Sequence, residues 1–136
     1  MFGMFGRVYY IDLSRQKIED IIIEEEIYRK YLGGYGLGAY FLLKNQKKGI
    51  DPLSEESIPG FLNATGVPMA GRSMSVGKSP LTGGWNDSNV GGYIGPEIKR
   101  TGYDGIFIIG KSNDPVYIYI SRDIEILDAS GLWGMD

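Results

Sequence analysis

The residues between positions 65 and 100 carry the groups best suited to bind a phosphorylated ligand. Arg72 lies in an expected turn after Gly71 and could contact a phosphate through two parallel N–H groups. Asn89 and Gly91 lie at the start of a helix expected over Gly91–Arg100, and free N–H groups at a helix start attract anions. Together these residues predict a pocket for a phosphorylated, polycyclic ligand that is held mostly by main chain. A long loop packed on a sheet, with no ligand, is the alternative interpretation.

Three glycine-rich motifs resemble nucleotide-binding loops, but their context excludes that function. Gly105–Ser112 matches the P-loop pattern GxxxxGKS, yet its four middle residues form a strand-like apolar run and a turn follows. Gly71–Ser79 has one residue too many between its glycines, and Pro80 follows directly. Gly34–Gly38 lacks the GxGxxG spacing and follows an expected helix rather than a strand. We therefore predict neither a P-loop nor a dinucleotide-binding fold.

The composition excludes several kinds of catalytic site. The 136 residues include no Cys and no His, so the chain cannot form a disulfide, a Cys/His zinc site, a thiolate-bound cluster or a His-dependent triad. The net charge of −3 argues against nucleic acid as a partner. No apolar run approaches the ~20 residues of a membrane span, and the N-terminus has no signal-peptide pattern. We expect a cytoplasmic protein that binds neither nucleic acid nor membrane.

The spacing of apolar residues predicts an α+β domain with mixed or antiparallel β-sheets and two or three short helices. Runs of β-branched and aromatic residues predict strands, and i, i+3, i+4 spacing predicts helices. The expected strands are Arg7–Leu13, Lys17–Glu24, Ile58–Ala64, Ser73–Lys78, Gly105–Gly110, Val116–Ser121 and Ile124–Leu127. The expected helices are Glu24–Leu32, Gly36–Lys48 and Gly91–Arg100, and Pro80–Asn89 is expected to be a loop.

Seven motifs spread along the chain carry a specific resemblance to a known family. They are Gly33–Tyr40, Gly71–Ser73, Lys78–Gly83, Asp87–Tyr93, Gly95–Lys99, Gly102–Ile106 and Asp128–Gly134. In the order and spacing of these motifs, the chain resembles the N-terminal domain of the tungsten-containing aldehyde:ferredoxin oxidoreductase family over essentially its whole length. The resemblance implies a pair of related β-sheets that form the base for a tungsten, or molybdenum, bis-pterin cofactor.

The resemblance also implies roles for individual residues. Arg72 matches the phosphate-contacting arginine of the family, and Asn89 and Gly91 match its pterin-contacting loop. The main-chain carbonyl of Asn89 is the matching candidate ligand for a magnesium ion that joins the two pterin phosphates. Two departures stand out. Tyr35 replaces the Arg usual at its position, and Ile58–Gly66 is a few residues shorter than the strand and turn of the family.

The resemblance sets expectations for the whole protein. Residues 1–136 are expected to be a single, incomplete tungstopterin-binding domain, because the cysteines for a 4Fe-4S cluster and the acid–base residues of the family lie in later domains. The full-length enzyme would oxidise aldehydes to carboxylic acids with ferredoxin as electron acceptor. This chain alone would be inactive, and no catalytic residue is assigned to it. An incomplete domain could also form a homodimer through exposed apolar sheet surface. A separately encoded, non-catalytic binding or assembly subunit and a β scaffold without cofactor are the alternatives.

Overall fold

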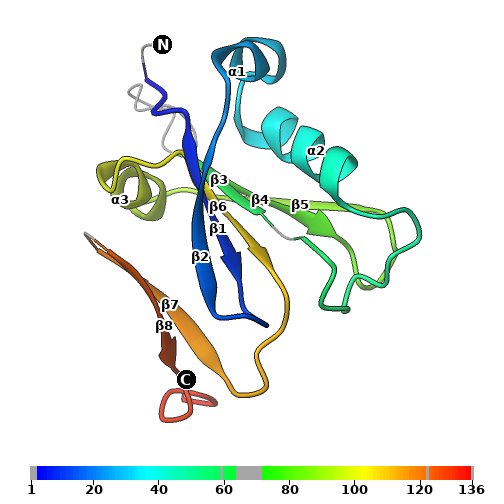
Figure 1. Ribbon diagram of the computed structural model, residues 1–136, viewed down its shortest axis with the longest axis vertical. Coiled ribbons are helices and arrows are strands. Elements are labelled where there is room, and N and C mark those ends of the chain that lie inside the picture. Colours follow the sequence, from blue (N-terminus) through cyan, green and yellow to red (C-terminus); the bar gives the residue numbers. More distant parts are fainter. Residues whose placement is uncertain (1–2, 59, 64–71, 122, 136) are drawn as a thin grey trace.

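Eight strands and three helices make up the computed structural model, which describes residues 3–58, 60–63, 72–121 and 123–135 (Figure 1). The strands are β1 (Arg7–Asp12), β2 (Lys17–Ile22), β3 (Gly60–Asn63), β4 (Ser73–Lys78), β5 (Trp85–Val90), β6 (Gly105–Ile109), β7 (Val116–Ile120) and β8 (Ile124–Asp128). The helices are α1 (Glu25–Tyr31), α2 (Gly34–Asn45) and α3 (Ile94–Arg100). The expected α+β class is confirmed.

Six of the strands form one mixed sheet in the order β2-β1-β6-β3-β4-β5. β1 and β6 run parallel to each other at its centre, and every other neighbouring pair is antiparallel. β7 and β8 form a separate antiparallel hairpin, which lies at the lower left in Figure 1 and packs against the central strands of the large sheet. The mixed sheet pairs strands from both halves of the chain, so β5 at its edge is tied to the central strands through β4 and β3.

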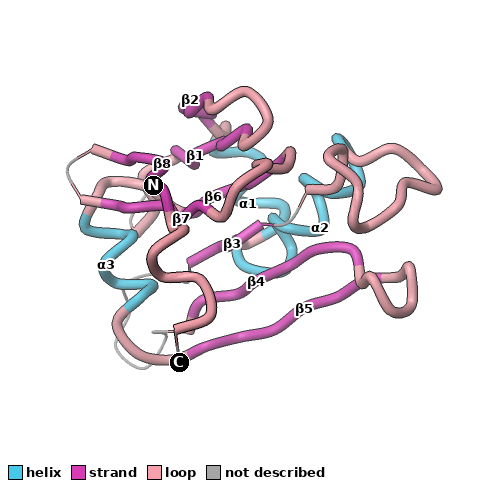
Figure 2. The backbone as a smooth tube through the Cα atoms, turned by 90° about the horizontal axis from the view of Figure 1, so that it is seen from below, coloured by secondary structure: helices cyan, strands magenta, loops and turns pink. Residues whose placement is uncertain are grey.

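Two apolar clusters cover opposite faces of the central strands. Successive side chains of a strand point to opposite faces, so Val8 and Phe107 face one cluster while Tyr9 and Ile106 face the other. The first cluster includes the buried side chains of α1 and α2. The second includes Ile98 of α3 and the isoleucines of the β7–β8 hairpin. In Figure 2, α2 lies to the right of the sheet and α3 to its left, in agreement with their places in the two different clusters.

Two expectations for the segment before α3 are wrong. Residues 85–89, expected within the loop Pro80–Asn89, form β5 together with Val90, because the main chain of this polar segment pairs with all six residues of β4. Its side chains are all exposed, so no apolar alternation marked it as a strand. The third helix begins at Ile94 rather than Gly91, since Gly92 has a φ of +99°, which is incompatible with a right-handed helix.

The remaining boundaries differ from expectation by a few residues. α2 begins at Gly34 and ends at Asn45, where the sequence predicted residues 36–48. The strand expected over Ile58–Ala64 is present as β3, and residues 59 and 64–71 lie outside the described part of the chain, together with the expected turn at Gly71. No helix in the described part of the chain is long and apolar enough to cross a membrane.

The rejection of the P-loop at Gly105–Ser112 is confirmed. Gly105–Ile109 is the central strand β6, which pairs with β1 on one side and β3 on the other. Its amide groups therefore form the hydrogen bonds of the sheet and cannot surround a phosphate.

Close packing against this strand explains why position 60 is a glycine. A Cβ at Gly60 would lie 2.6 Å from Cε1 of Phe107. Only glycine lets β3 approach the buried ring.

Candidate functional site

The structure brings Arg72, Asn89 and Tyr35 together at one end of the β4–β5 ladder. The Arg72 guanidinium donates a hydrogen bond to Oδ1 of Asn89 through Nη1. The Asn89 amide in turn donates to the hydroxyl of Tyr35 through Nδ2, at 3.2 Å. These three side chains form one continuous hydrogen-bonded series; Arg72 lies immediately before β4, Asn89 on β5 and Tyr35 in the first turn of α2. Both contacts are solvent-exposed, so a ligand in solution can reach these side chains.

The register of the two strands explains why these residues meet. Asn89 lies directly opposite Met74, so both side chains point to the same face of the sheet. Arg72 is two residues before Met74 and therefore shares that face. α2 starts over the same place, since a Cβ at Gly34 would lie 3.5 Å from Cγ of Met74. The face of the ladder that carries the site is therefore the one that α2 partly covers.

The main chain of Asn89 faces the open edge of the sheet. The ladder of β4 and β5 begins at the pair Lys78–Trp85. Just before it, the Ser79 N–H donates to the Gly84 carbonyl at 2.9 Å, so Ser79 and Gly84 are in the hydrogen-bonded position. Hydrogen-bonded and non-hydrogen-bonded pairs alternate along an antiparallel ladder, and the register runs unbroken to Val90. Met74 and Asn89 are then a non-hydrogen-bonded pair. The Asn89 carbonyl points away from β4, at an edge where the described part of the chain has no further strand.

Gly91 and Gly92 continue this open edge beyond β5. A Cβ built at Gly91 would meet no atom within 4 Å, so open space adjoins the main chain here. Gly91 lies three residues before the start of α3, and that helix is only seven residues long. The expected helix start at Gly91 is therefore wrong, and the anion site expected there stays a prediction. Exposed strand-edge and loop main chain takes the place of that helix start.

The buried carboxylate of Asp104 connects three parts of the domain through hydrogen bonds. Asp104, 2% exposed, accepts hydrogen bonds from the Tyr28 hydroxyl at 2.6 Å and from the Gly6 N–H at 2.8 Å, and it pairs with Lys99. Burial alone would raise the pKa of Asp104, but the hydrogen bonds from Lys99, Tyr28 and Phe5 N–H outweigh it and hold the pKa below its usual range. Burial of the Tyr28 side chain raises the pKa of its hydroxyl far above the ordinary value, and the hydrogen bond to Asp104 raises it further. Asp104 thus joins the N-terminal segment, α1 and α3.

A family model described as "Aldehyde ferredoxin oxidoreductase, N-terminal domain" matches residues 8–136. The chain belongs to this family. As an aldehyde ferredoxin oxidoreductase N-terminal domain, it is 45% identical to the tungsten-containing aldehyde ferredoxin oxidoreductase of Pyrococcus horikoshii over 98% of this chain. It is 38% identical to a Pyrococcus furiosus protein named aliphatic sulfonate oxidoreductase, WOR-like subunit, over 99% of this chain. In both cases the chain spans 23% of the length of the relative.

A solved structure shares the fold of this N-terminal domain closely. The active-site complex BamBC of benzoyl coenzyme A reductase, in complex with 1,5-dienoyl-CoA, superposes with a TM-score of 0.92 at 35% identity. The match covers 97% of this chain and 21% of that one. The resemblance identified from the sequence motifs is therefore confirmed at the level of family and fold.

The residues of this N-terminal domain fit a phosphorylated pterin cofactor of the kind the family implies. A guanidinium suits a phosphate, since it can donate two parallel hydrogen bonds. The outward Asn89 carbonyl is an oxygen donor of the type that Mg²⁺ prefers, and the open space at Gly91 leaves room for a ring beside the main chain. In the described part of the chain no cluster of three or more acidic side chains could hold a metal by itself.

Sequence reasoning found Arg72, Asn89 and Gly91 by residue type and motif, but it missed Tyr35 as part of the site. Tyr35 was noted only as a departure from the family's usual Arg. Its contact with Asn89 depends on where α2 crosses the β4–β5 ladder, and β5 itself was expected to be a loop.

Proposed function

We propose that this chain forms part of the base that binds a tungsten, or molybdenum, bis-pterin cofactor in an oxidoreductase. The complete enzyme oxidises aldehydes to carboxylic acids and passes electrons to ferredoxin in the cytoplasm. One observation carries the proposal. The hydrogen-bonded side chains of Arg72, Asn89 and Tyr35 lie beside the open main-chain edge of β5, within a domain of the aldehyde ferredoxin oxidoreductase family. Tungsten-containing relatives at 45% identity support the choice of metal.

Each residue of the site has a distinct task in this proposal. Arg72 binds a pterin phosphate through its guanidinium, and the Asn89 side chain orients that guanidinium by accepting one of its hydrogen bonds. Tyr35 fixes the Asn89 amide from the other side. The outward carbonyl of Asn89 would supply an oxygen ligand to a magnesium ion bound with the cofactor. Gly91 lets the pterin ring lie against the main chain, because any Cβ there would fill that space.

The bound cofactor supplies the redox-active metal and its dithiolene sulfur ligands, which removes the need for a protein thiolate. The 136 residues contain no Cys, so a thiolate-bound 4Fe-4S cluster would be held by the remaining domains, which in this proposal also supply the acid–base groups. Residues 1–136 act as one domain unit that holds the cofactor and does not catalyse by itself. The remaining enzyme domains are its principal partners, and a homodimer of the complete enzyme is part of the proposal.

Metal and pterin analysis of the protein tests this function. We expect the protein, produced together with the remaining enzyme domains, to contain tungsten or molybdenum and two pterins per chain. The metal is measured by inductively coupled plasma mass spectrometry and the pterin by fluorescence after oxidation. A well-folded complex that contains neither metal nor pterin contradicts the proposal and favours a β scaffold without cofactor.

A further inference from the structure

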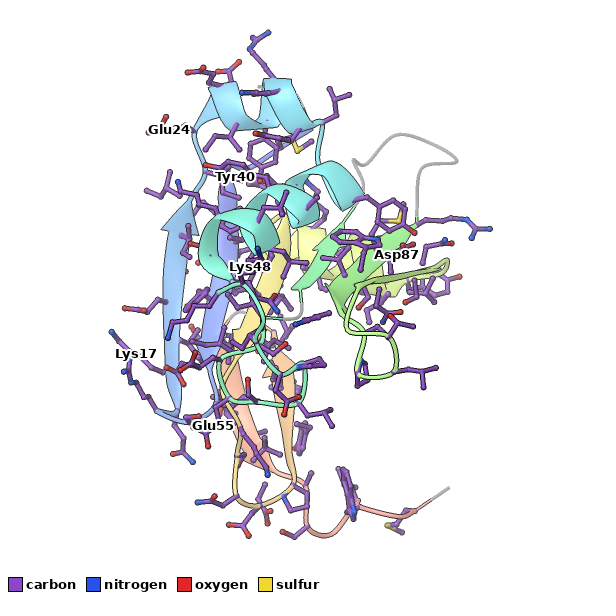
Figure 3. All side chains as sticks on the ribbon, turned by 90° about the vertical axis from the view of Figure 1, so that its right-hand side faces the viewer. Lys17, Glu24, Tyr40, Lys48, Glu55 and Asp87 are labelled. Carbon is purple, nitrogen blue, oxygen red and sulfur yellow. The ribbon has the colours of Figure 1, made fainter. Side chains whose placement is uncertain are left out.

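A second groove lies on the same side of the sheet, at the opposite end of β5 from Asn89. It occupies about 580 Å³ between the C-terminal half of α2 and the β4–β5 hairpin. Figure 3 looks onto this side, with Lys48 beyond the end of α2 and Asp87 on β5 labelled. Trp85, which lines the groove, is four residues from Asn89, or about 13 Å along a strand. The volume is in the range of small-molecule sites, about 300–1,000 Å³.

The walls of this α2–β5 groove are apolar and one of them is flat. Trp85 is 47% exposed, and its indole N–H donates to Oδ1 of Asp87 at 2.6 Å, which fixes the orientation of the ring. Leu43 of α2 lines the groove and is 86% exposed, although it is a large apolar residue. A planar ring could lie on the indole and contact Leu43, so that both side chains lose apolar surface to the ligand.

The charged side chains that line the α2–β5 groove are lysines, while the Asp87 carboxylate lies at the indole N–H of Trp85. Lys47, Lys48 and Lys78 line it, and none of its described lining residues is acidic. Lys47 is paired with Glu56 at 2.9 Å. Lys78 donates to the main-chain carbonyl of Ile50, a neutral acceptor that leaves the positive charge of the ammonium group uncompensated. Lys48 adds a further exposed ammonium group. An anionic group beside the ring would therefore gain charge-assisted hydrogen bonds.

We propose that the α2–β5 groove binds a small planar aromatic anion, with its ring on Trp85 and its anionic group between Lys48 and Lys78. The shared chemistry fits two sources, a nucleoside monophosphate and an aromatic carboxylate. The site is separate from the Arg72–Asn89–Tyr35 site and does not depend on the proposed cofactor function. It uses an exposed tryptophan, a cationic end and a cavity, none of which the cofactor site requires.

Isothermal titration calorimetry with two probes tests the proposal. Adenosine monophosphate represents the nucleotide source and 2-naphthoate the aromatic carboxylate source, with uncharged adenosine and 2-naphthol as matched controls. We expect at least one anion to bind with a Kd below about 1 mM and its uncharged control to bind several-fold more weakly. Binding of either anion supports the proposal and identifies the source. If neither anion binds, or if the uncharged compounds bind equally well, the proposal is overturned.

Paired variants assign the binding to this groove. Trp85→Leu is expected to weaken binding about tenfold, since stacking on an aromatic side chain contributes at that level. Trp133→Leu, at an exposed tryptophan outside the groove, should leave the Kd unchanged. Lys48→Gln and Lys78→Gln should each weaken binding about two- to fivefold, while Lys30→Gln on α1 should not. Equal effects of Trp85→Leu and Trp133→Leu would overturn the assignment.

Discussion

At the scale of single residues, the decisive feature is a guanidinium that is oriented before any ligand arrives. Arg72 is exposed, and its hydrogen bond to Asn89 reduces the freedom that a long side chain would lose on binding. The bond leaves other N–H groups of the guanidinium open to phosphate oxygens, since arginine has five donors. Arg72 and Asn89 thus work as a pair, and the sequence alone named both residues without showing that they touch.

Removal of the Arg72 guanidinium should lower cofactor occupancy. A charge-assisted contact to phosphate contributes about 1.5–3 kcal/mol, so we expect Arg72→Ala in the full-length protein to retain clearly less metal and pterin after dialysis. Arg29→Ala is the matched control, because Arg29 is an exposed arginine on α1 that pairs with Glu25. Unchanged metal and pterin content in Arg72→Ala would remove the phosphate assignment.

Two glycines allow stability and cofactor binding to be separated. Gly60→Ala places a methyl group 2.6 Å from a buried ring carbon of Phe107, and we expect it to lower the free energy of unfolding by about 1–3 kcal/mol. Gly91→Ala meets no protein atom within 4 Å, so it should unfold like the parent protein. It should nevertheless lower pterin content, because its methyl group fills the space proposed for the ring. Urea denaturation and pterin fluorescence measure the two effects, and a destabilised Gly91→Ala would show that this space is not open.

At the scale of elements, the sequence predicted strands correctly where apolar residues form a clear pattern and missed a strand where they do not. The hairpin of β1 and β2, the strands β4 and β6, and the hairpin of β7 and β8 were predicted because their side chains alternate or are buried on both faces. β5 was missed, because its stability comes from main-chain pairing with β4, and no side-chain pattern reports such pairing. The two missed features, β5 and the late start of α3, both lie at the site. The segment there is polar and glycine-rich, so intrinsic propensity says little about its structure.

The Asp104 network makes stability depend on pH in the acid range. The folded-state pKa of Asp104 is lowered, so its contribution is fully present above the unfolded pKa of about 3.9 and is lost as the pH falls through the folded value. Asp104→Asn should therefore destabilise the protein at pH 7, by about 3 kcal/mol, because it leaves the largely buried Lys99 ammonium unpaired. As the pH falls through the lowered folded-state pKa of Asp104, the variant and the parent should converge.

Urea denaturation between pH 2 and pH 7 measures this convergence. Asp128→Asn is the matched control, since the pKa of Asp128 is also lowered, but only by exposed hydrogen bonds from Ser130. We expect that control to change the slope of stability against pH far less than Asp104→Asn. A constant stability difference between Asp104→Asn and the parent at every pH would mean that the carboxylate charge does not contribute.

At the scale of the whole molecule, burial divides the strands into a rigid centre and exposed margins. β1 and β6 have buried residues on both faces, whereas every side chain of β5 is exposed and its outer edge has no partner in the described part of the chain. The β7–β8 hairpin shares no ladder with the large sheet and contacts it through isoleucine side chains. Local opening is easiest where few apolar contacts and many exposed hydrogen bonds occur. The proposed cofactor site is therefore built on one of the least protected strands.

Hydrogen exchange of the full-length protein can show whether cofactor binding acts on that strand. Without cofactor, we expect amides of β1 and β6 to exchange slowest and those of β5 and of the β7–β8 hairpin to exchange much faster. With cofactor bound, β5 and residues 91–93 should gain protection, because binding to the folded state alone stabilises it and the contacts are made there. The β7–β8 hairpin, which contributes no residue to the site, serves as the internal control. Equal gains in protection at β5 and at this hairpin would indicate general stabilisation rather than a cofactor held by the β5 edge.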